Sequence, residues 1–495
     1  MNPTVEKIRQ GLPADWEVLR TVYELLRNAN VFCVNDNNEK IVEFVQPAEL
    51  KKLIDLSISE DKSLNETEIL SMCRKVIQYS VKTTHNRFHN QLFGQMDPYG
   101  LFGSWITEAL NTSAYTFEVG PVFSLIETEV IKKMCDICGY ANGDGIFAPG
   151  GSISNMYALA LARYKICPDI KAKGIFGIKP LVLFTSEESH YSFKKAANWL
   201  GLGTDNCVCV KTNARGQMLP LDLEAKILEA KKLDKTPFFV NSTAGTTVLG
   251  AFDDLNDIAD VCQRYGLWLH VDGCHGASVL ISKENRHLMN GVERSDSLAW
   301  NPHKALGAPL QCAMFLTREK DLMSRCNSTE VKYLFQQDKF YDVSYDTGNK
   351  SIQCGRKIDS FKFWLMLKAR GVNGLGSLVD HAIKMAKIFV QKLLQREGYR
   401  LVQDSFSYTN VCFWYIPKAM RGQEENSEWE AKLYTVAPKI KEKMIRSGTL
   451  MVGYSPLAYR GVGNFIRMIF TCYPVIDEKE LDAILDEIEF LAEQD

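Results

Sequence analysis

The sequence has no uncharged apolar run of about 18 or more residues, the length that a helix needs to cross a bilayer. It also has no cationic start followed by a short apolar segment, which a secretory signal would carry. Neither sign of charge is in excess, because 58 lysines and arginines stand against 60 aspartates and glutamates, for a formal net charge of −2. A field strong enough to attract nucleic acid or an anionic lipid surface is thereby excluded. We expect a cytoplasmic protein with no membrane span and no nucleic-acid partner.

Cysteine and histidine pairs at zinc-binding spacing are lacking as well. The 14 cysteines include Cys135 with Cys138 and Cys207 with Cys209, but no second cysteine pair or histidine pair accompanies them at that spacing. We interpret the cysteines as buried, reduced thiols and expect no metal site. Repeats and low-complexity tracts are absent too. What is present, 46% apolar and 24% charged residues over 495 positions, is typical of a folded globular protein with a large core.

Three segments of the chain differ in their patterns. Residues 1–85 show helical periodicity, as over 16–28 and 66–83, with few strand signals, and are predicted to form a helical N-terminal arm. Residues 86–360 are predicted to form a large α/β domain. Residues 361–495 are predicted to form a small C-terminal α+β domain.

Short apolar runs alternate with amphipathic segments in the large predicted domain. The predicted strands are 181–185, 207–211, 238–242, 267–272 and 297–300, and the predicted helices are 193–200, 221–232 and 253–265. This alternation favours a mostly parallel sheet with helices on both faces, whose ligands bind outside the carboxyl ends of the strands. In the small domain we expect helices over 361–369, 378–396 and 428–447, strands over 411–415 and 465–470, and a terminal helix.

A lysine and an aspartate stand at the ends of predicted strands. The sequence Trp-Asn-Pro-His-Lys ends at Lys304, and the predicted strand 267–272 ends in Asp272. A lysine at a strand end is often merely solvated, but neighbouring strand ends would bring this amine and carboxylate together, and burying both charges is costly. Pyridoxal phosphate (PLP) gives the pair a purpose, because a lysine holds its aldehyde and a carboxylate keeps its ring nitrogen protonated.

A glycine-rich segment offers an anchor for the cofactor phosphate. Residues 147–155 read Phe-Ala-Pro-Gly-Gly-Ser-Ile-Ser-Asn. Gly151 lets the backbone approach closely, Ser152 and Ser154 offer hydroxyls, and a helix beginning near Asn155 would point its N–H groups at the phosphate. Alone such a triplet is usually a plain turn, but here it stands at the start of the α/β region.

These motifs, together with His190 after a predicted strand and Val-Asp-Gly-Cys-His at 271–275, resemble the group II PLP-dependent amino acid decarboxylases. Similar stretches at 333–348 and 354–366 extend the resemblance to the branch that contains the glutamate, cysteine sulfinate and aspartate 1-decarboxylases. It runs from about residue 75 to the C-terminus. It implies PLP fold type I, with a large mostly parallel-sheet domain, a helical N-terminal arm and a small C-terminal domain. It also implies an obligate homodimer with active sites shared between subunits.

The resemblance further implies residue roles. His190 would stack on the cofactor ring and Cys274 would pack on its opposite face, although a histidine that opens a surface helix has the same local sequence. Arg467 would hold the substrate α-carboxylate by a bidentate contact. Tyr341, in an irregular loop over 336–347, would donate the proton to Cα, with Tyr345 as a second candidate. The remaining implied cofactor contacts are Thr246, Asn301, His303 and Gln91, the last beside the ring hydroxyl and close to the substrate.

Two positions bear on the substrate. Phe93 stands where similar glutamate decarboxylases carry a small hydroxyl residue, and Ser113 resembles the cysteine sulfinate type. A bulky residue would shorten the pocket and favour aspartate or cysteine sulfinate, making β-alanine or hypotaurine. One methylene is worth only about 1–3 kcal/mol, so glutamate decarboxylation to GABA stays open. Residues 119–121 and 305–309 look closer to invertebrate members of the branch. An aminotransferase or another PLP lyase, and a catalytically silent PLP-fold scaffold, also remain as alternatives.

Overall fold

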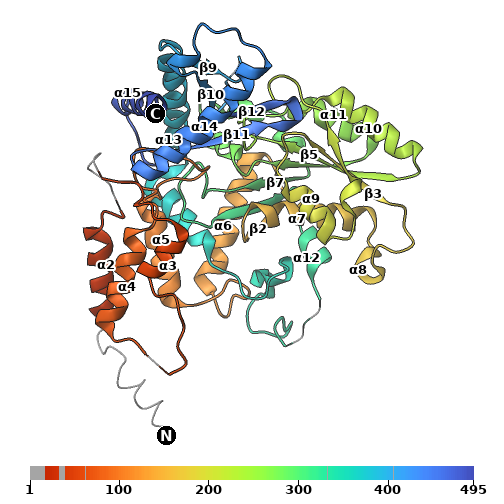
Figure 1. Cartoon of the computed structure of the whole chain (residues 1–495). Coiled ribbons are helices and arrows are strands. Elements are labelled where there is room, and N and C mark those ends of the chain that lie inside the picture. Colours follow the sequence, from red (N-terminus) through yellow and green to blue (C-terminus); the bar gives the residue numbers. More distant parts are fainter. Residues whose placement is uncertain are drawn as a thin grey trace.

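The computed structural model describes residues 17–32, 39–61, 63–329, 331, 333–404 and 406–494. Figure 1 shows a large sheet in the middle of the molecule, with the N-terminal helices at one side and the C-terminal sheet and helices packed above it. Nowhere in those ranges is a helix both long and apolar enough to span a bilayer.

The large sheet has seven strands in the order β2-β8-β7-β6-β5-β3-β4. They are β2 (Asp144–Ala148), β3 (Leu181–Ser186), β4 (Cys207–Val210), β5 (Thr236–Thr243), β6 (Trp268–Asp272), β7 (Ser297–Trp300) and β8 (Ala313–Thr317). The pairings from β7 through β4 are parallel, whereas β8 runs antiparallel to both β2 and β7. The predicted mostly parallel sheet is confirmed, and the pair β2 and β8 is added to it.

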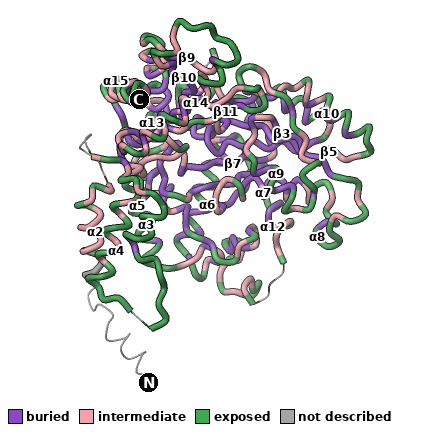
Figure 2. Tube along the Cα trace, viewed as in Figure 1, coloured by how far each residue is buried: buried purple, intermediate pink, exposed green. Residues whose placement is uncertain are grey.

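Helices cover both faces of this sheet because nearly every strand residue is buried and successive side chains point to opposite faces. In β3, Leu181 and Leu183 pack with α7 (Gly151–Ile166) and α9 (Ser192–Trp199). Val182 and Phe184 pack on the other face, with α10 (Pro220–Lys232) and α11 (Leu255–Tyr265). In Figure 2 the strands β3, β5 and β7 are buried, and exposed residues lie on the outer helices.

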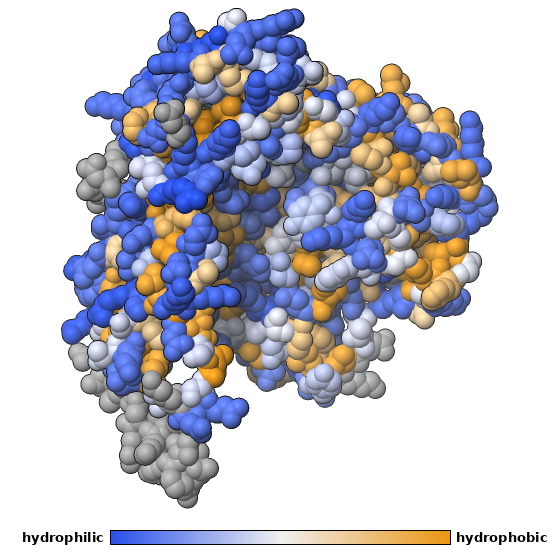
Figure 3. Space-filling view, viewed as in Figure 1, coloured by the Kyte–Doolittle hydropathy of each residue, from blue (hydrophilic) through white to orange (hydrophobic). Residues whose placement is uncertain are grey.

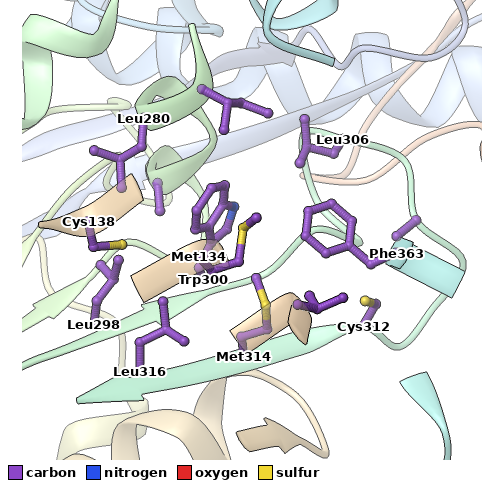
Figure 4. Packing of buried hydrophobic residues seen from close by; sticks show 14 of the residues in the cluster. Met134, Cys138, Leu280, Leu298, Trp300, Leu306, Cys312, Met314, Leu316 and Phe363 are labelled. Carbon is purple, nitrogen blue, oxygen red and sulfur yellow. The ribbon is translucent and has the colours of Figure 1, made fainter. Parts of the chain in front are cut away.

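The largest hydrophobic cluster lies where the other end of the sheet meets α6 (Pro121–Cys138) and α13 (Asp359–Leu394). Trp300 of β7 stands at its centre beside Met134 and Phe363, as Figure 4 shows. The strand ends that carry polar groups are therefore held by a rigid, fully packed core.

The small C-terminal sheet has the order β1-β11-β12-β10-β9. Its strands are β1 (Phe88–His89), β9 (Tyr399–Leu401), β10 (Asn410–Tyr415), β11 (Met451–Leu457) and β12 (Val462–Ile469), and its helices are α14 (Ser427–Ser447) and α15 (Glu478–Glu493). The two helices predicted over 361–369 and 378–396 are confirmed as two helical stretches of α13, which a kink at Gly371 separates. Gly371 has a φ of 65° and a ψ of 166°, a backbone conformation that suits only a residue without a side chain.

The described N-terminal part consists of helices joined by irregular segments. It holds α2 (Glu17–Asn28), α3 (Pro47–Leu53) and α4 (Glu66–Gln78), followed by α5 (Pro98–Leu110). The rest of the predicted arm, residues 1–16, 33–38 and 62, lies outside the described residues. Two short helices, α8 (Ile170–Lys173) and α12 (Leu322–Asn327), complete the α-helices of the described chain. The domain boundaries at 85 and 360 stay predictions.

Candidate active site

A cavity of about 200 Å³ opens at the carboxyl ends of the central strands, where the sequence predicted a ligand. The register of the parallel strands places Thr243, Asp272 and Ala299 side by side, at or near the ends of β5, β6 and β7. The chain that follows β7 adds one wall and the N-terminus of α7 another. Eight of the predicted residues line the cavity: Gly151, Ser152, His190, Asp272, Cys274, Asn301, His303 and Lys304.

Asp272 is the anion of the cavity. Its side chain is buried, its Oδ2 accepts a hydrogen bond from Nδ2 of Asn155 at 2.9 Å, and its Oδ1 accepts one from the backbone N–H of Cys274 at 3.1 Å. Burial alone would raise the pKa of this carboxyl group, but the charge of Lys304, together with the hydrogen bond from Cys274, holds the pKa below its ordinary value. Asp272 is therefore ionised at neutral pH.

Two histidines and the thiol of the cavity wall are neutral at pH 7. Burial lowers the pKa of His190, and it lowers the pKa of His303 to about 4. Burial also raises the pKa of the Cys274 thiol well above its ordinary value. Nδ1 of His190 lies 2.9 Å from the hydroxyl of Ser192, and Nδ1 of His303 lies 2.7 Å from the backbone oxygen of Cys312. One carboxylate and one lysine thus dominate the charge of the site.

The N-terminus of α7 fits a phosphate group. A Cβ atom added at Gly151 would lie 2.5 Å from Sγ of Cys274 and 2.7 Å from Nδ2 of Asn301, so only glycine leaves this corner open. Oδ1 of Asn301 is buried and has no hydrogen-bond partner among the described residues. The first N–H groups of a helix lack carbonyl partners within the helix and favour an anion. The helix begins at Gly151, four residues before the position that the sequence suggested.

The cavity also contains residues that the sequence analysis did not select. They are Asn155, Tyr191, Thr243, Gly245, Thr247 and His275. His275 is buried, and within the described chain neither of its ring nitrogens has a hydrogen-bond partner. Its position three residues after Asp272 was a signal available in the sequence.

Arg467 and Thr246 lie beside the cavity rather than in its wall. Arg467, in β12, donates to the backbone oxygens of Thr247 at 3.1 Å and Asn90 at 3.3 Å, and Thr247 lines the cavity. Thr246 is buried, and its hydroxyl accepts the N–H of Ala251 at 3.0 Å. The small domain thus reaches the cavity edge through Arg467.

Four other predicted residues lie apart from this wall. Gln91 is exposed and Phe93 is half-buried, both in the chain between β1 and α5. Ser113 accepts a hydrogen bond from the backbone N–H of Arg356 at 2.8 Å. Tyr341 donates to Asp346 at 3.1 Å. Ser113 and Tyr341 belong to one cluster. Arg356, which contacts Ser113, also donates to Thr347 at 3.0 Å, and Thr347 is the chain neighbour of Asp346, which contacts Tyr341.

Comparison with known proteins shows the family to which the chain belongs. Residues 47–416 match the model of the pyridoxal-dependent decarboxylase conserved domain. The chain belongs to this family of decarboxylases. Among similar proteins, acidic amino acid decarboxylase GADL1 of Bos taurus is 52% identical over 468 residues, which cover 94% of this chain and 89% of the relative. Cysteine sulfinic acid decarboxylase of Mus musculus is 48% identical over 477 residues, 96% of each chain.

The fold agrees with this membership. A crystal structure of mouse CSAD superimposes with a TM-score of 0.93 at 46% sequence identity, over 98% of this chain and all of that one. The protein is therefore a PLP-dependent decarboxylase of fold type I, as the resemblance implied, and the cofactor prediction is confirmed at the level of the family.

Proposed function

We propose that this decarboxylase acts on short acidic amino acids, converting aspartate to β-alanine and cysteine sulfinate to hypotaurine. The observation that carries the proposal is the placement of the half-buried Lys304 and the buried Asp272 in one cavity at the strand ends. The similarity to decarboxylases named for acidic amino acids and for cysteine sulfinic acid supports the substrate class.

The cavity residues divide the work of holding the cofactor. Lys304 would hold the aldehyde, the ionised Asp272 would face the ring nitrogen, and His190 and Cys274 would contact the two ring faces. Gly151, Ser152, Asn301 and His303 would surround the phosphate and the lysine, with Thr246 and Gln91 nearby. When bound, PLP withdraws electrons from the substrate Cα, which allows the bond to the carboxylate to break.

The substrate would be oriented by residues at the cavity edge. The guanidinium of Arg467 would bind the α-carboxylate and set the angle at which it leaves. Tyr341 would then deliver a proton to Cα while the loop around it excludes water. Phe93 would shorten the pocket, and Ser113 would contact the acidic side chain.

A homodimer with shared sites is part of the proposal. Several large apolar side chains of α5 and α6 are exposed in the single chain: Phe102, Trp105, Ile106, Leu110, Val122 and Leu125. Figure 3 shows apolar side chains gathered on the surface around α5. Contiguous exposed apolar side chains of this kind are typical of protein–protein contact surfaces. The cluster of Ser113 and Tyr341 is separate from the cavity that contains Lys304. This separation supports the proposal that the cluster contributes to the active site of the partner subunit.

We also propose that the protein works in the cytoplasm, where thiols stay reduced. The 13 cysteines in the described chain are all free. Burial raises the pKa values of several of them, for example that of Cys207 to about 11, which keeps them unreactive.

The test combines cofactor trapping with a product assay. The protein is loaded with PLP, reduced with borohydride and digested, and the modified peptide is identified by mass spectrometry. We expect the cofactor on Lys304 and no adduct in Lys304→Ala. The loaded enzyme is then given aspartate, cysteine sulfinate and glutamate in parallel, with β-alanine, hypotaurine and GABA as products. An adduct at another lysine, or faster turnover of glutamate than of both shorter acids, would contradict the proposal.

A further inference from the structure

Strand β6 presents a row of polar side chains to α7. Residues two apart in a strand share a face, so Trp268, His270 and Asp272 point to the same side of the sheet. Ser297 of β7 stands opposite His270 in the register. Asn155, one turn into α7 and 1% exposed, contacts this row from above. All of these groups are buried.

The hydrogen bonds join into one chain. The indole N–H of Trp268 donates to the Ser297 hydroxyl at 2.9 Å, which lies 2.8 Å from Nδ1 of His270. Nε2 of His270 lies 3.1 Å from Oδ1 of Asn155. Nδ2 of Asn155 donates to Asp272 and to Ser192, both at 2.9 Å. The Ser192 hydroxyl then lies 2.9 Å from Nδ1 of His190.

The two ends of this chain allow only one direction of donation. An indole N–H can only donate, and an ionised carboxylate can only accept. Asn155 must therefore turn its NH₂ group to Asp272 and Ser192 and its oxygen to His270, which carries its proton on Nε2. Burial lowers the pKa of His270 to about 4, so the ring is neutral and fits this pattern. The Ser192 hydroxyl is left to donate to His190.

The backbone supports the same assignment at His190. The N–H of Ser192 also points at Nδ1 of His190, at 3.3 Å, and a backbone N–H can only donate. Nδ1 is thus the acceptor and Nε2 carries the proton.

We propose that Asn155 is a positioning residue that acts on two contacts of the cofactor ring, Asp272 at the ring nitrogen and His190 on one ring face. One N–H fixes the carboxylate of Asp272, and the other, through Ser192, fixes the tautomer of His190. His270, Ser297 and Trp268 fix the amide of Asn155 itself. This inference rests on the proposed placement of PLP against Asp272 and His190.

The test uses cofactor affinity of the full-length apoprotein, measured by titration with PLP and quenching of tryptophan fluorescence. Asn155→Asp keeps the shape of the side chain but replaces both donors by an acceptor, and Asn155→Ala removes the group. Hydrogen bonds to charged groups are strong, so we expect each variant to weaken PLP binding by about tenfold to a hundredfold. We expect Asn155→Asp to bind PLP no more tightly than Asn155→Ala does, because its carboxylate would face that of Asp272.

Asn285→Ala is the matched control, since Asn285 is also buried and donates to a carboxylate, that of Asp380, at 2.8 Å, away from the cavity. We expect it to lower the melting temperature as much as the Asn155 variants do while leaving the PLP affinity within about threefold of the original. Asn155→Asp with unchanged PLP affinity would overturn the inference. If Asn155→Ala does not fold, the isosteric Asn155→Asp still decides the question.

Ser192→Ala tests the branch to His190. We expect it to lower kcat with little change in PLP affinity, and its effect on kcat should be smaller in the Asn155→Ala background, since residues of one network are not additive. Strictly additive effects of the two substitutions on kcat would overturn the inference that Asn155 acts on His190 through Ser192. Asp272→Ala separates this inference from the proposed site: if that variant binds PLP normally, the placement of the cofactor is wrong, whereas if it fails and Asn155→Asp binds normally, only the relay is wrong.

Discussion

The buried ion pair of Arg356 and Glu127 permits a stability prediction of unusual size. Both side chains are about 3% exposed, and a second contact joins them at 3.0 Å. Arg356 also donates to the backbone oxygen of Ala114 at 2.6 Å and to that of Phe147 at 3.3 Å. Replacing it by methionine would leave the Glu127 charge and the Phe147 carbonyl buried without this partner, whereas the Ala114 carbonyl keeps the Thr347 hydroxyl at 3.1 Å.

The magnitude follows from these losses. Removing one partner of a buried ion pair costs about 3–5 kcal/mol, and the Phe147 carbonyl adds about 1–3 kcal/mol where water cannot replace the donor. We expect Arg356→Met to lose about 5 kcal/mol or more of the free energy of unfolding, a large part of the ~5–15 kcal/mol that stabilises ordinary proteins. The double variant Glu127→Met with Arg356→Met buries no lone charge and should be the more stable of the two.

The assay is urea unfolding of the three proteins followed by circular dichroism, with the single and double variants compared at equal protein concentration. The same single variant should lose decarboxylase activity, because the backbone of Arg356 holds Ser113 and its side chain holds Thr347. A double variant that is less stable than Arg356→Met would refute the reasoning, since it would show that the pair contributes more than the cost of an isolated charge.

Three further predictions follow from the cavity and its surroundings. Gly151→Ala should weaken PLP binding about tenfold or more, because the new Cβ would lie 2.5 Å from Sγ of Cys274, and adding Cys274→Ala should restore part of the loss in the same titration. Tyr341→Phe should keep PLP and lose about 10²-fold or more in decarboxylation, or divert to transamination, as measured by product analysis, and unchanged turnover would contradict its role as proton donor. The pKa of His303, lowered from 6.5 to about 4, predicts a contribution to stability that is present above pH 6.5 and is lost as pH falls toward 4, by about 3 kcal/mol. Urea unfolding should therefore show the gap between the original protein and His303→Gln narrowing over that range, and a constant gap would contradict the lowered pKa.

The sequence predicted the central sheet well because its strands carry continuous apolar runs between amphipathic helices. The runs at 181–185 and 297–300 became β3 and β7 almost residue for residue. Parallel order then brought the ends of several strands to one edge, so that Asp272 and Lys304 could be placed in one cavity before the structure was known. Local pattern and a general rule of sheet architecture were sufficient there.

The antiparallel pair β2 and β8 was missed for a physical reason. Its five register pairs, from Asp144 with Thr317 to Ala148 with Ala313, join segments that are far apart in sequence, and both strands are short and wholly buried. A short buried run has no alternation to distinguish a strand from a turn of helix. By contrast, the interruption between the helices predicted over 361–369 and 378–396 agrees with the kink at Gly371.

The sequence predicts the geometry of the proposed cofactor-binding half of the site better than that of the proposed substrate-binding half, because the two halves come from different kinds of elements. The proposed cofactor half comes from the strand ends of one sheet and from α7, so sequence order nearly determines its geometry. The proposed substrate half comes from loops around Phe93, Ser113 and Tyr341 and from Arg467 in the second sheet, whose positions depend on how separate parts pack. The relay through Asn155 lies between these cases: the alternation of Trp268, His270 and Asp272 was visible in the sequence, but only the crossing of α7 over that face reveals which amide joins them.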